Sequence, residues 1–330
     1  DDAIADLQKE DLIDPGAQDL LYQGDAEKWL NLAYGLKARY TMHLLKRSAN
    51  KDADMEKVLE YVDNSFESAE EQAAFDVYDA NNINPLYGFF VARAGLGASE
   101  SMRSKLAEYN DPRLSRAFIT KQGASGKEQA PGTADNAVYA PNGTPEQGTS
   151  KYGTSLFMYS ISAPTLLLSY HELKFLEAEA LCRLERDAKS ALKDAVVAGL
   201  LNAENSFTIS RKELGKTLIN AASSITEAEA ESYFDNTIEA KYTAEPLKTT
   251  MIQKYFALWG ASGEATESYN DVRRMKGLGE NFIELKNPNS FPLRCPYGNS
   301  DTTTNAEVKA AYGNGQYVYS ENVWWAGGSR

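Results

Sequence analysis

Residues 164–180 read PTLLLSYHELKFLEAEA, and this stretch decides the fold of the chain. Its apolar side chains recur at helical spacing and continue one turn beyond it: Leu166, Tyr170, Leu173, Ala180 and Leu184. Such spacing places side chains on one face of a helix. Pro164 suits a first helical turn, where its missing N–H needs no partner. The pattern predicts a helix that begins at Ala163 and packs one apolar face against a core.

Further helices are predicted downstream of this one. A short polar turn leads to a helix over 189–201, and the two helices form a hairpin of about the 34 residues that a tetratricopeptide unit occupies. Capping boxes of the form S/T-x-x-E predict helix starts at Ser210 and at Thr226. Another helix is predicted over 249–259.

Two antiparallel helices are predicted near the N-terminus. Asp25 is the expected N-cap of the first helix. That helix carries one apolar stripe: Trp29, Leu32, Ala33, Leu36, Tyr40 and Leu44. The second helix is predicted over 53–66. The N-terminal part of the chain is therefore predicted to be helical, like the part that begins at residue 163.

The segments between these helices are irregular in composition. Residues 78–97, YDANNINPLYGFFVARAGLG, combine turn formers with aromatic side chains and predict a long structured loop. We expect four parts: a helical hairpin and loop (1–110), a loop-rich excursion (111–162), helical hairpins (163–285) and an irregular C-terminal segment (286–330). Together they predict one mainly α-helical domain over 1–330 with long irregular loops and few short strands.

Several motifs along the chain resemble one known family. The motifs are Asp19-x-x-Tyr22-x-Gly24-Asp25-x-x-Lys28-Trp29 running into Leu36-Lys-Ala-Arg39-Tyr-Thr-Met42, the stretch 164–180, Ile252-Gln253-Lys254-Tyr255, Tyr269-Asn-Asp-Val-Arg-Arg274, and Phe291-Pro-Leu-Arg294 with Tyr297 and Asn305. In this order they are similar to the SusD/RagB-like outer-membrane lipoproteins that bind nutrients, usually glycans. Tyr255 and Tyr269 stand where that family usually has tryptophan.

The resemblance implies a fold of tetratricopeptide-like hairpins whose long loops form a ligand face. It also implies a lipid-anchored protein of the outer-membrane surface that sits over a SusC-like TonB-dependent transporter. Members hold oligosaccharides, or in some branches peptides, before import. The family's lipidated cysteine and first hairpins have no counterpart in these residues, so we expect the anchor and part of the N-terminal fold to lie outside this sequence.

Charge and composition limit the partners. The 34 basic and 47 acidic side chains give a net charge of −13, which repels nucleic acid and anionic membrane faces. No apolar run approaches the roughly 20 residues of a membrane span. Cys182 and Cys295 lack metal-ligand spacing and are predicted to be two buried free thiols. His43 and His171 have no His or Cys partner at ligand spacing, so we predict structural or solvated roles and neither a metal nor a cofactor.

Aromatic and amide side chains in irregular segments are the expected ligand contacts. Sugars present apolar C–H faces and hydroxyl edges, so rings stack on the former and amides bond the latter. The main predicted set is Tyr78, Asn81, Asn82, Asn84, Tyr87, Phe89, Phe90 and Arg93. The alternative is that Phe89 and Phe90 pack the loop onto the helices while the asparagines only turn it.

A second predicted set lies in the polar excursion. It comprises Tyr139, Asn142, Tyr152 and Phe157. The competing interpretation is a surface decoration without a role in binding. Among the tryptophans, Trp29 and Trp259 are expected in the core, and Trp324-Trp325 is expected to cap the core, with contact to a ligand as the alternative.

Other functional classes stay open at this point. A glycosidase needs only two carboxylates, and Asp111, Asp135 and Glu146 lie in predicted loops, but no spacing selects a pair. The sequence has no G-x-S-x-G, P-loop or H-E-x-x-H motif. A helical-repeat scaffold that binds protein segments is the third class. We expect no catalytic residue, and a glycan receptor, with a peptide-binding receptor as the alternative.

Overall fold

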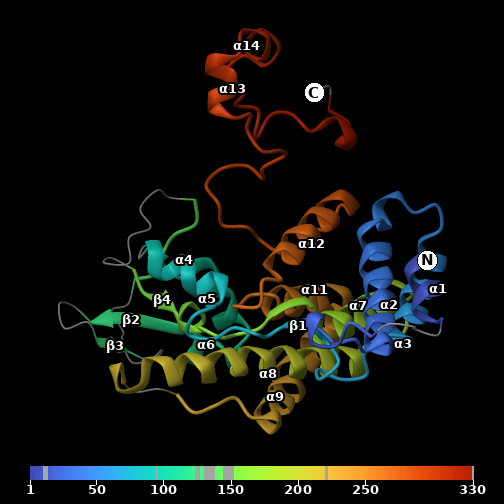
Figure 1. The fold of residues 1–330 in the computed structure, drawn as a ribbon, viewed down its shortest axis with the longest axis vertical. Coiled ribbons are helices and arrows are strands. Elements are labelled where there is room, and N and C mark those ends of the chain that lie inside the picture. The colour runs from blue at the N-terminus through green and yellow to red at the C-terminus, as the bar shows by residue number, and fades with distance from the viewer. Residues whose placement is uncertain are drawn as a thin grey trace. The chain divides into compact units, whose positions relative to one another are not determined.

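The computed structural model describes residues 1–9, 14–93, 96–122, 127–129, 138–143, 152–219 and 222–328. The chain forms two compact units. The main unit comprises 1–141 with 146–284, and the C-terminal unit comprises 142–145 with 285–330. A single domain over 1–330 stays a prediction. Helices dominate and the strands are few and short, which confirms the predicted mainly α-helical class (Figure 1).

The stretch at 164–180 forms a strand followed by a helix. β5 (Thr165–Leu168) pairs antiparallel with β1 (Ala73–Phe75), and α7 (Tyr170–Arg183) follows. The predicted helix start at Ala163 is therefore wrong. The hydroxyl of Ser169 accepts a hydrogen bond of 3.0 Å from the backbone N–H of Glu172, so Ser169 is the N-cap. A strong cap at Ser169 leaves Thr165–Leu168 extended and available to pair with β1.

The long helix α8 (Lys189–Leu214) packs against α7, as predicted, but extends well beyond residue 201. The predicted helix start at Ser210 is wrong, because Ser210 is buried inside α8. Its hydroxyl lies 2.9 Å from the carbonyl of Ser206 and 2.7 Å from the hydroxyl of Ser160. The second capping box is confirmed: Thr226 caps α9 (Glu227–Tyr233) and accepts from the Glu229 N–H at 3.2 Å.

The remaining elements of the main unit surround this pair. The helices are α1 (Asp2–Leu7), α2 (Ala26–His43), α3 (Lys51–Asp63), α4 (Pro85–Arg93), α5 (Glu100–Glu108), α6 (Leu114–Ala117), α10 (Glu239–Ala244), α11 (Pro246–Ala257) and α12 (Ala265–Leu278), with a π-helical turn at Phe234–Ile238. A small sheet has the order β4 (Thr154–Ser155), β2 (Phe118–Gln122), β3 (Lys127–Gln129) and β6 (Leu218–Ile219). Asp25 caps α2 as predicted.

α7 joins two hydrophobic cores. Phe175 and Ala178 belong to the core that α8 and α11 share, whereas Leu173, Leu176 and Ala180 belong to the core with α2 and α3. In Figure 1, α2 and α3 lie near one end of α8, and α4, α5, β2 and β3 lie towards its other end. The apolar faces of α7 therefore hold both halves of the main unit together.

Two tryptophans lie in these cores as predicted. The Trp259 ring stacks on Phe118, with 5.5 Å between centroids. Trp29 packs against the core with α2 and α3, meets Tyr22 edge-on at 5.4 Å, and donates from Nε1 to a carboxylate oxygen of Asp19 at 2.7 Å. Burial combined with one polar partner is the usual environment of an indole.

The C-terminal unit contains two short helices, α13 (Asn299–Thr304) and α14 (Ala306–Tyr312). The ring of Tyr297 stacks on Tyr312 at 4.4 Å. Trp324 is 74% exposed, its predicted packing or ligand role stays a prediction, and the side chain of Trp325 lies outside the described residues. Cys295 is also exposed, which corrects the prediction of two buried thiols, and Cys182 is half-buried. Neither hydrophobic core cluster includes a described residue of 285–328.

Candidate functional site

The predicted ligand segment is a turn followed by a helix. The expectation of a loop over 78–97 is wrong for α4, which begins at Pro85. Asn84 caps it: the side-chain carbonyl accepts from the Leu86 N–H at 2.8 Å, and the side-chain amide donates to the Ala163 carbonyl at 2.8 Å. Asn followed by Pro is a helix-start signal that the sequence carries. The buried Asn84 thus fixes α4 to the residues before β5.

The asparagines before α4 form its entry turn. One carboxylate oxygen of Asp79 accepts from the backbone N–H groups of Asn81 and Asn82, each at 2.7 Å. This is an Asx-turn, in which a short acidic side chain takes the place of a backbone acceptor. Asn81 and Asn82 are exposed. Their turn-forming backbone leaves the side chains at the surface beside α4.

The aromatic side chains of this segment divide between core and surface. Phe90 is 7% exposed and meets the Tyr159 ring edge-on at 5.1 Å. Phe89 is 51% exposed. Tyr87 is half-buried and its hydroxyl donates to Glu213 at 3.4 Å. Tyr78 is half-buried, with its hydroxyl 2.9 Å from that of Thr165.

Phe89 carries the exposed aromatic ring of this helix, while Tyr87 and the exposed Val91, one turn apart, lie on its other flank because residues two apart project in nearly opposite directions. We call these three side chains the α4 surface. The side chain of Arg93 lies outside the described residues. The packing alternative fits Phe90, whereas Phe89 points away from the core. The ligand-binding role of the whole set stays a prediction.

The sequence patterns did not identify Glu213, which lies next to this surface. It lies near the end of α8, far from Tyr87 along the chain, and its carboxylate fixes the Tyr87 hydroxyl. Burial and the nearby charge of Glu213 raise the pKa of the Tyr87 phenol. No local signal predicts the pair, because it depends on how α4 meets the end of α8.

The second predicted set is not gathered at this surface. The rings of Tyr139, Tyr152 and Phe157 are buried, Tyr139 against Phe118 at 5.2 Å. Asn142 lies in the C-terminal unit, where its amide donates to Asn287 at 3.1 Å. Rings in these positions pack the interior and present no face to solvent, so a ligand role for them stays a prediction without a surface to support it.

The motif residues that carry the family resemblance form a buried ionic network. Arg39 of α2 donates to both carboxylate oxygens of Glu172 on α7, from Nε at 2.8 Å and from Nη2. Lys254 of α11 pairs with Asp271 of α12 at 2.8 Å. Arg274 of α12 pairs with the same Asp271 at 2.7 Å. These side chains are almost wholly buried, and they tie four helices together.

Glu179 of α7 completes this network. It receives hydrogen bonds from Arg274 and from Arg183, the latter at 2.8 Å. Burial alone would raise the pKa of Glu179, but the charges of Arg274 and Arg183 outweigh it and hold the pKa far below its usual value. Every cation of the network faces a carboxylate. Its groups hold the fold and are not free for a ligand.

Both histidines pair with carboxylates. His43 Nε2 lies 2.7 Å from Glu267, and His171 Nε2 lies 3.3 Å from the buried Glu264. Burial would raise the pKa of Glu267, but the hydrogen bond from His43 and the charges of Arg39 and His43 lower it to about 2. The predicted structural role is confirmed. No group of His, Cys, Asp and Glu side chains suited to a metal occurs among the described residues.

The acidic residues considered for glycoside hydrolysis do not form a described pair. Asp111 is buried, and its carboxylate accepts from Arg113 Nη2 at 2.6 Å and from the Tyr233 hydroxyl at 3.4 Å. Asp135 and Glu146 lie outside the described residues. Asp111 is thus committed to structural partners.

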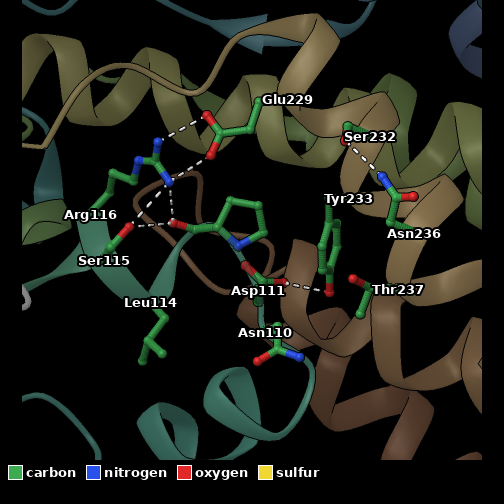
Figure 2. A pocket seen from close by; sticks show the side chains of 11 residues that line it. Asn110, Asp111, Leu114, Ser115, Arg116, Glu229, Ser232, Tyr233, Asn236 and Thr237 are labelled. Carbon is green, nitrogen blue, oxygen red and sulfur yellow. Dashed lines mark hydrogen bonds and ion pairs between the residues drawn. The ribbon is translucent and has the colours of Figure 1, made fainter.

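Two hollows open on the main unit. The first, about 490 Å³, lies between the turn at 110–116 and the segment 229–237 (Figure 2). The second, about 430 Å³, lies between α7, α8 and α9 and is lined by Tyr170, Asn202 and Asn205 among others. Within the described part of the chain, no helix has the length and apolar character needed to cross a bilayer.

Comparisons with known proteins agree with the motifs. The SusD-like family model, described as starch-binding and associating with the outer membrane, matches residues 1–297. A solved SusD/RagB family protein from Bacteroides thetaiotaomicron is 66% identical, with a TM-score of 0.91, and the match covers 100% of this chain and 71% of that one. No curated protein matches the chain.

More distant solved structures share the fold. A chitin-binding protein is 21% identical with a TM-score of 0.61, covering 93% of this chain and 66% of that one. A SusD homologue from Bacteroides fragilis is 20% identical with a TM-score of 0.64, covering 90% of this chain and 67% of that one.

Proposed function

Because this chain belongs to the SusD-like family of starch-binding proteins that associate with the outer membrane, we propose that it is a cell-surface receptor for oligosaccharides. It captures the glycan and passes it to a SusC-like TonB-dependent transporter without chemistry of its own. A lipid anchor holds it at the outer membrane. The net charge of −13 suits a neutral ligand better than an anionic one.

The α4 surface is the observation that carries the proposal. Phe89 offers an exposed ring on one flank of α4, and Tyr87 on the other flank has its hydroxyl held by Glu213. Rings of this kind stack on the C–H faces of sugars, and a carboxylate accepts hydrogen bonds from their hydroxyls. α4 therefore carries a ring suited to stacking on one flank and a hydroxyl–carboxylate pair suited to hydroxyl recognition on the other.

The position of α4 is fixed by side-chain contacts at its start and on its inner face. Asn84 fixes the start of α4 through its cap and its bond to the Ala163 carbonyl, and Phe90 anchors the helix from below against Tyr159. A preformed ring platform loses little conformational entropy on binding. Modest affinity is expected, in the range of about 10⁻⁶ to 10⁻³ M, because each stacked ring contributes on the order of 1 kcal/mol.

A binding screen tests this function. The purified protein is titrated against plant, host and microbial glycans and against a peptide pool, while reducing ends are assayed in parallel. Saturable binding to one glycan class without new reducing ends is expected. Binding of peptides alone would replace the glycan by a peptide ligand, and release of reducing ends would contradict a receptor without catalysis.

The transporter partner needs a separate measurement. The lipid-anchored protein is affinity-purified from outer membranes of its native cell in mild detergent. Co-purification of a TonB-dependent transporter in a fixed ratio is expected. Recovery without any transporter, at detergent levels that preserve other membrane complexes, would contradict the proposed handover.

A further inference from the structure

Two irregularities of the backbone meet at the hollow in Figure 2. Asn236 and Thr237 lie on the π-helical turn Phe234–Ile238, between α9 and α10. π-helical turns are rare in proteins, and those that occur are often at functional sites. On the other chain segment, Asn110 adopts a left-handed φ of 49°, which costs energy for any residue except glycine. Both irregular segments direct polar side chains to the same hollow.

The charged side chains that line the hollow already form ion pairs and hydrogen bonds within the protein. Arg116 donates to Glu229 at 2.9 Å, and its other nitrogens donate to the carbonyls of Pro112 and Ser223 at 3.1 and 3.0 Å. Asp111 is held by its buried partners, as described above. Figure 2 shows the Arg116–Glu229 pair on one side of the hollow and Asn110, Tyr233 and Thr237 on the other. The site therefore offers no free charge to an ionic ligand.

Neutral polar groups are what the hollow offers instead. The side chains of Asn110 and Thr237 make no hydrogen bond to another residue within the described ranges. Asn236 uses its amide N–H on the Ser232 hydroxyl at 2.9 Å, which leaves its carbonyl oxygen as an acceptor. Leu114 adds apolar surface. Amide, hydroxyl and carbonyl groups beside an aliphatic wall complement the hydroxyls and C–H faces of a sugar.

We propose that this hollow is an accessory site for one neutral sugar unit, separate from the α4 surface. The hollow is open to solvent and has a volume of about 490 Å³. Asn110 and Thr237 bind the hydroxyls of the sugar, and the paired charges of Arg116 and Glu229 keep its rim in shape. The proposal rests on the hollow alone and does not depend on which ligand the α4 surface takes.

The test uses the whole chain in a Phe89→Ala background, so that the α4 surface cannot supply the signal. Glucose, galactose, mannose and N-acetylglucosamine are added one at a time. Binding is followed by saturation-transfer NMR and by the backbone amide shifts of Asn236 and Thr237. At least one sugar is expected to bind and to move those two amides.

Two substitutions then locate the site. Asn110→Gly removes an amide while relieving the left-handed backbone, so the protein should melt no lower than its parent. Thr237→Val removes a hydroxyl at nearly constant volume. Each change should weaken sugar binding about fivefold to tenfold, the loss of a neutral hydrogen bond.

Three results would overturn the accessory site. They are the absence of binding by all four sugars, amide shifts elsewhere on the chain, or unchanged affinity in both variants. None of these results bears on the proposed receptor function, because that function is tested by oligosaccharide binding to the protein with Phe89 intact.

Discussion

Replacing Arg39 by Met breaks the pair that joins α2 to α7. Both oxygens of Glu172 accept from Arg39, and the two side chains are 9% and 0% exposed. Removing one partner of a buried pair typically costs about 3–5 kcal/mol, because the remaining charge stays buried without compensation. Arg39 also lowers the pKa of Glu267 nearby. We therefore expect a loss in the free energy of unfolding near the upper end of that range.

The loss should depend on pH in a defined direction. Burial already raises the pKa of Glu172 above 4.5 despite the opposing charge of Arg39, and removing Arg39 raises it further. A carboxyl whose pKa is higher in the folded than in the unfolded state destabilises the fold when ionised, and this penalty disappears below the unfolded value. The deficit of the variant should therefore shrink as pH falls from about 8 to about 5.

Urea unfolding followed by circular dichroism measures these differences, with the wild type at each pH as the reference. The double variant Arg39→Met with Glu172→Met is the control, since replacing a whole buried pair by apolar side chains is often nearly neutral. It should be more stable than Arg39→Met alone. A loss below about 1 kcal/mol, or a double variant less stable than the single one, would refute the reasoning.

Two further predictions concern the α4 segment and the histidine pairs. Phe90→Ala should lower the free energy of unfolding by about 3–5 kcal/mol in urea titrations, because it empties a core position against Tyr159. Phe89→Ala should leave the free energy of unfolding nearly unchanged, because that side chain is exposed. Equal losses in the two variants would contradict the division between core and surface. Glu267, 15% exposed beside His43, has a pKa lowered from 4.5 to about 2, so its stabilisation is complete above pH 4.5 and is lost as pH falls towards 2. The stability difference between wild type and Glu267→Gln should shrink by on the order of 3 kcal/mol across that window, and a constant difference would contradict the pair.

Much of the helical framework could be predicted because its signals are local. Asp25 and Thr226 are short-range caps, and the structure confirms both. The error at Ser210 arose where a tertiary contact overrides a local motif: its hydroxyl bonds Ser160, fifty residues away, and α8 runs on to Leu214. A capping box is informative only where no distant partner competes for the serine.

The α4 helix was missed for a different reason. Apolar residues cover most of the helix, so Leu86 and Phe90 on the inner face do not stand out from Phe89 and Val91 on the outer face. The Asn84–Pro85 start was the available signal. The contact between Tyr87 and Glu213 could not be predicted, since it exists only after α4 meets the end of α8.

The motif residues show a similar limit. Their order along the chain indicated the family, but their chemistry could not be inferred from it. Arg39 and Glu172 are separated by 133 positions in the sequence, and Arg274 and Glu179 are separated by 95 positions. Several residues that identify the family therefore hold the helices of the main unit together, while the candidate ligand surface lies on a helix that the motifs do not include.

The affinity of the Phe89→Ala variant for the glycan found in the screen tests the receptor account most directly. Isothermal titration calorimetry compares wild type, Phe89→Ala and Tyr40→Ala, the last being a control at another exposed aromatic ring on α2. The account predicts about fivefold weaker binding or more for Phe89→Ala, unchanged binding for Tyr40→Ala and equal melting temperatures for all three. Wild-type affinity in the Phe89→Ala variant would contradict it.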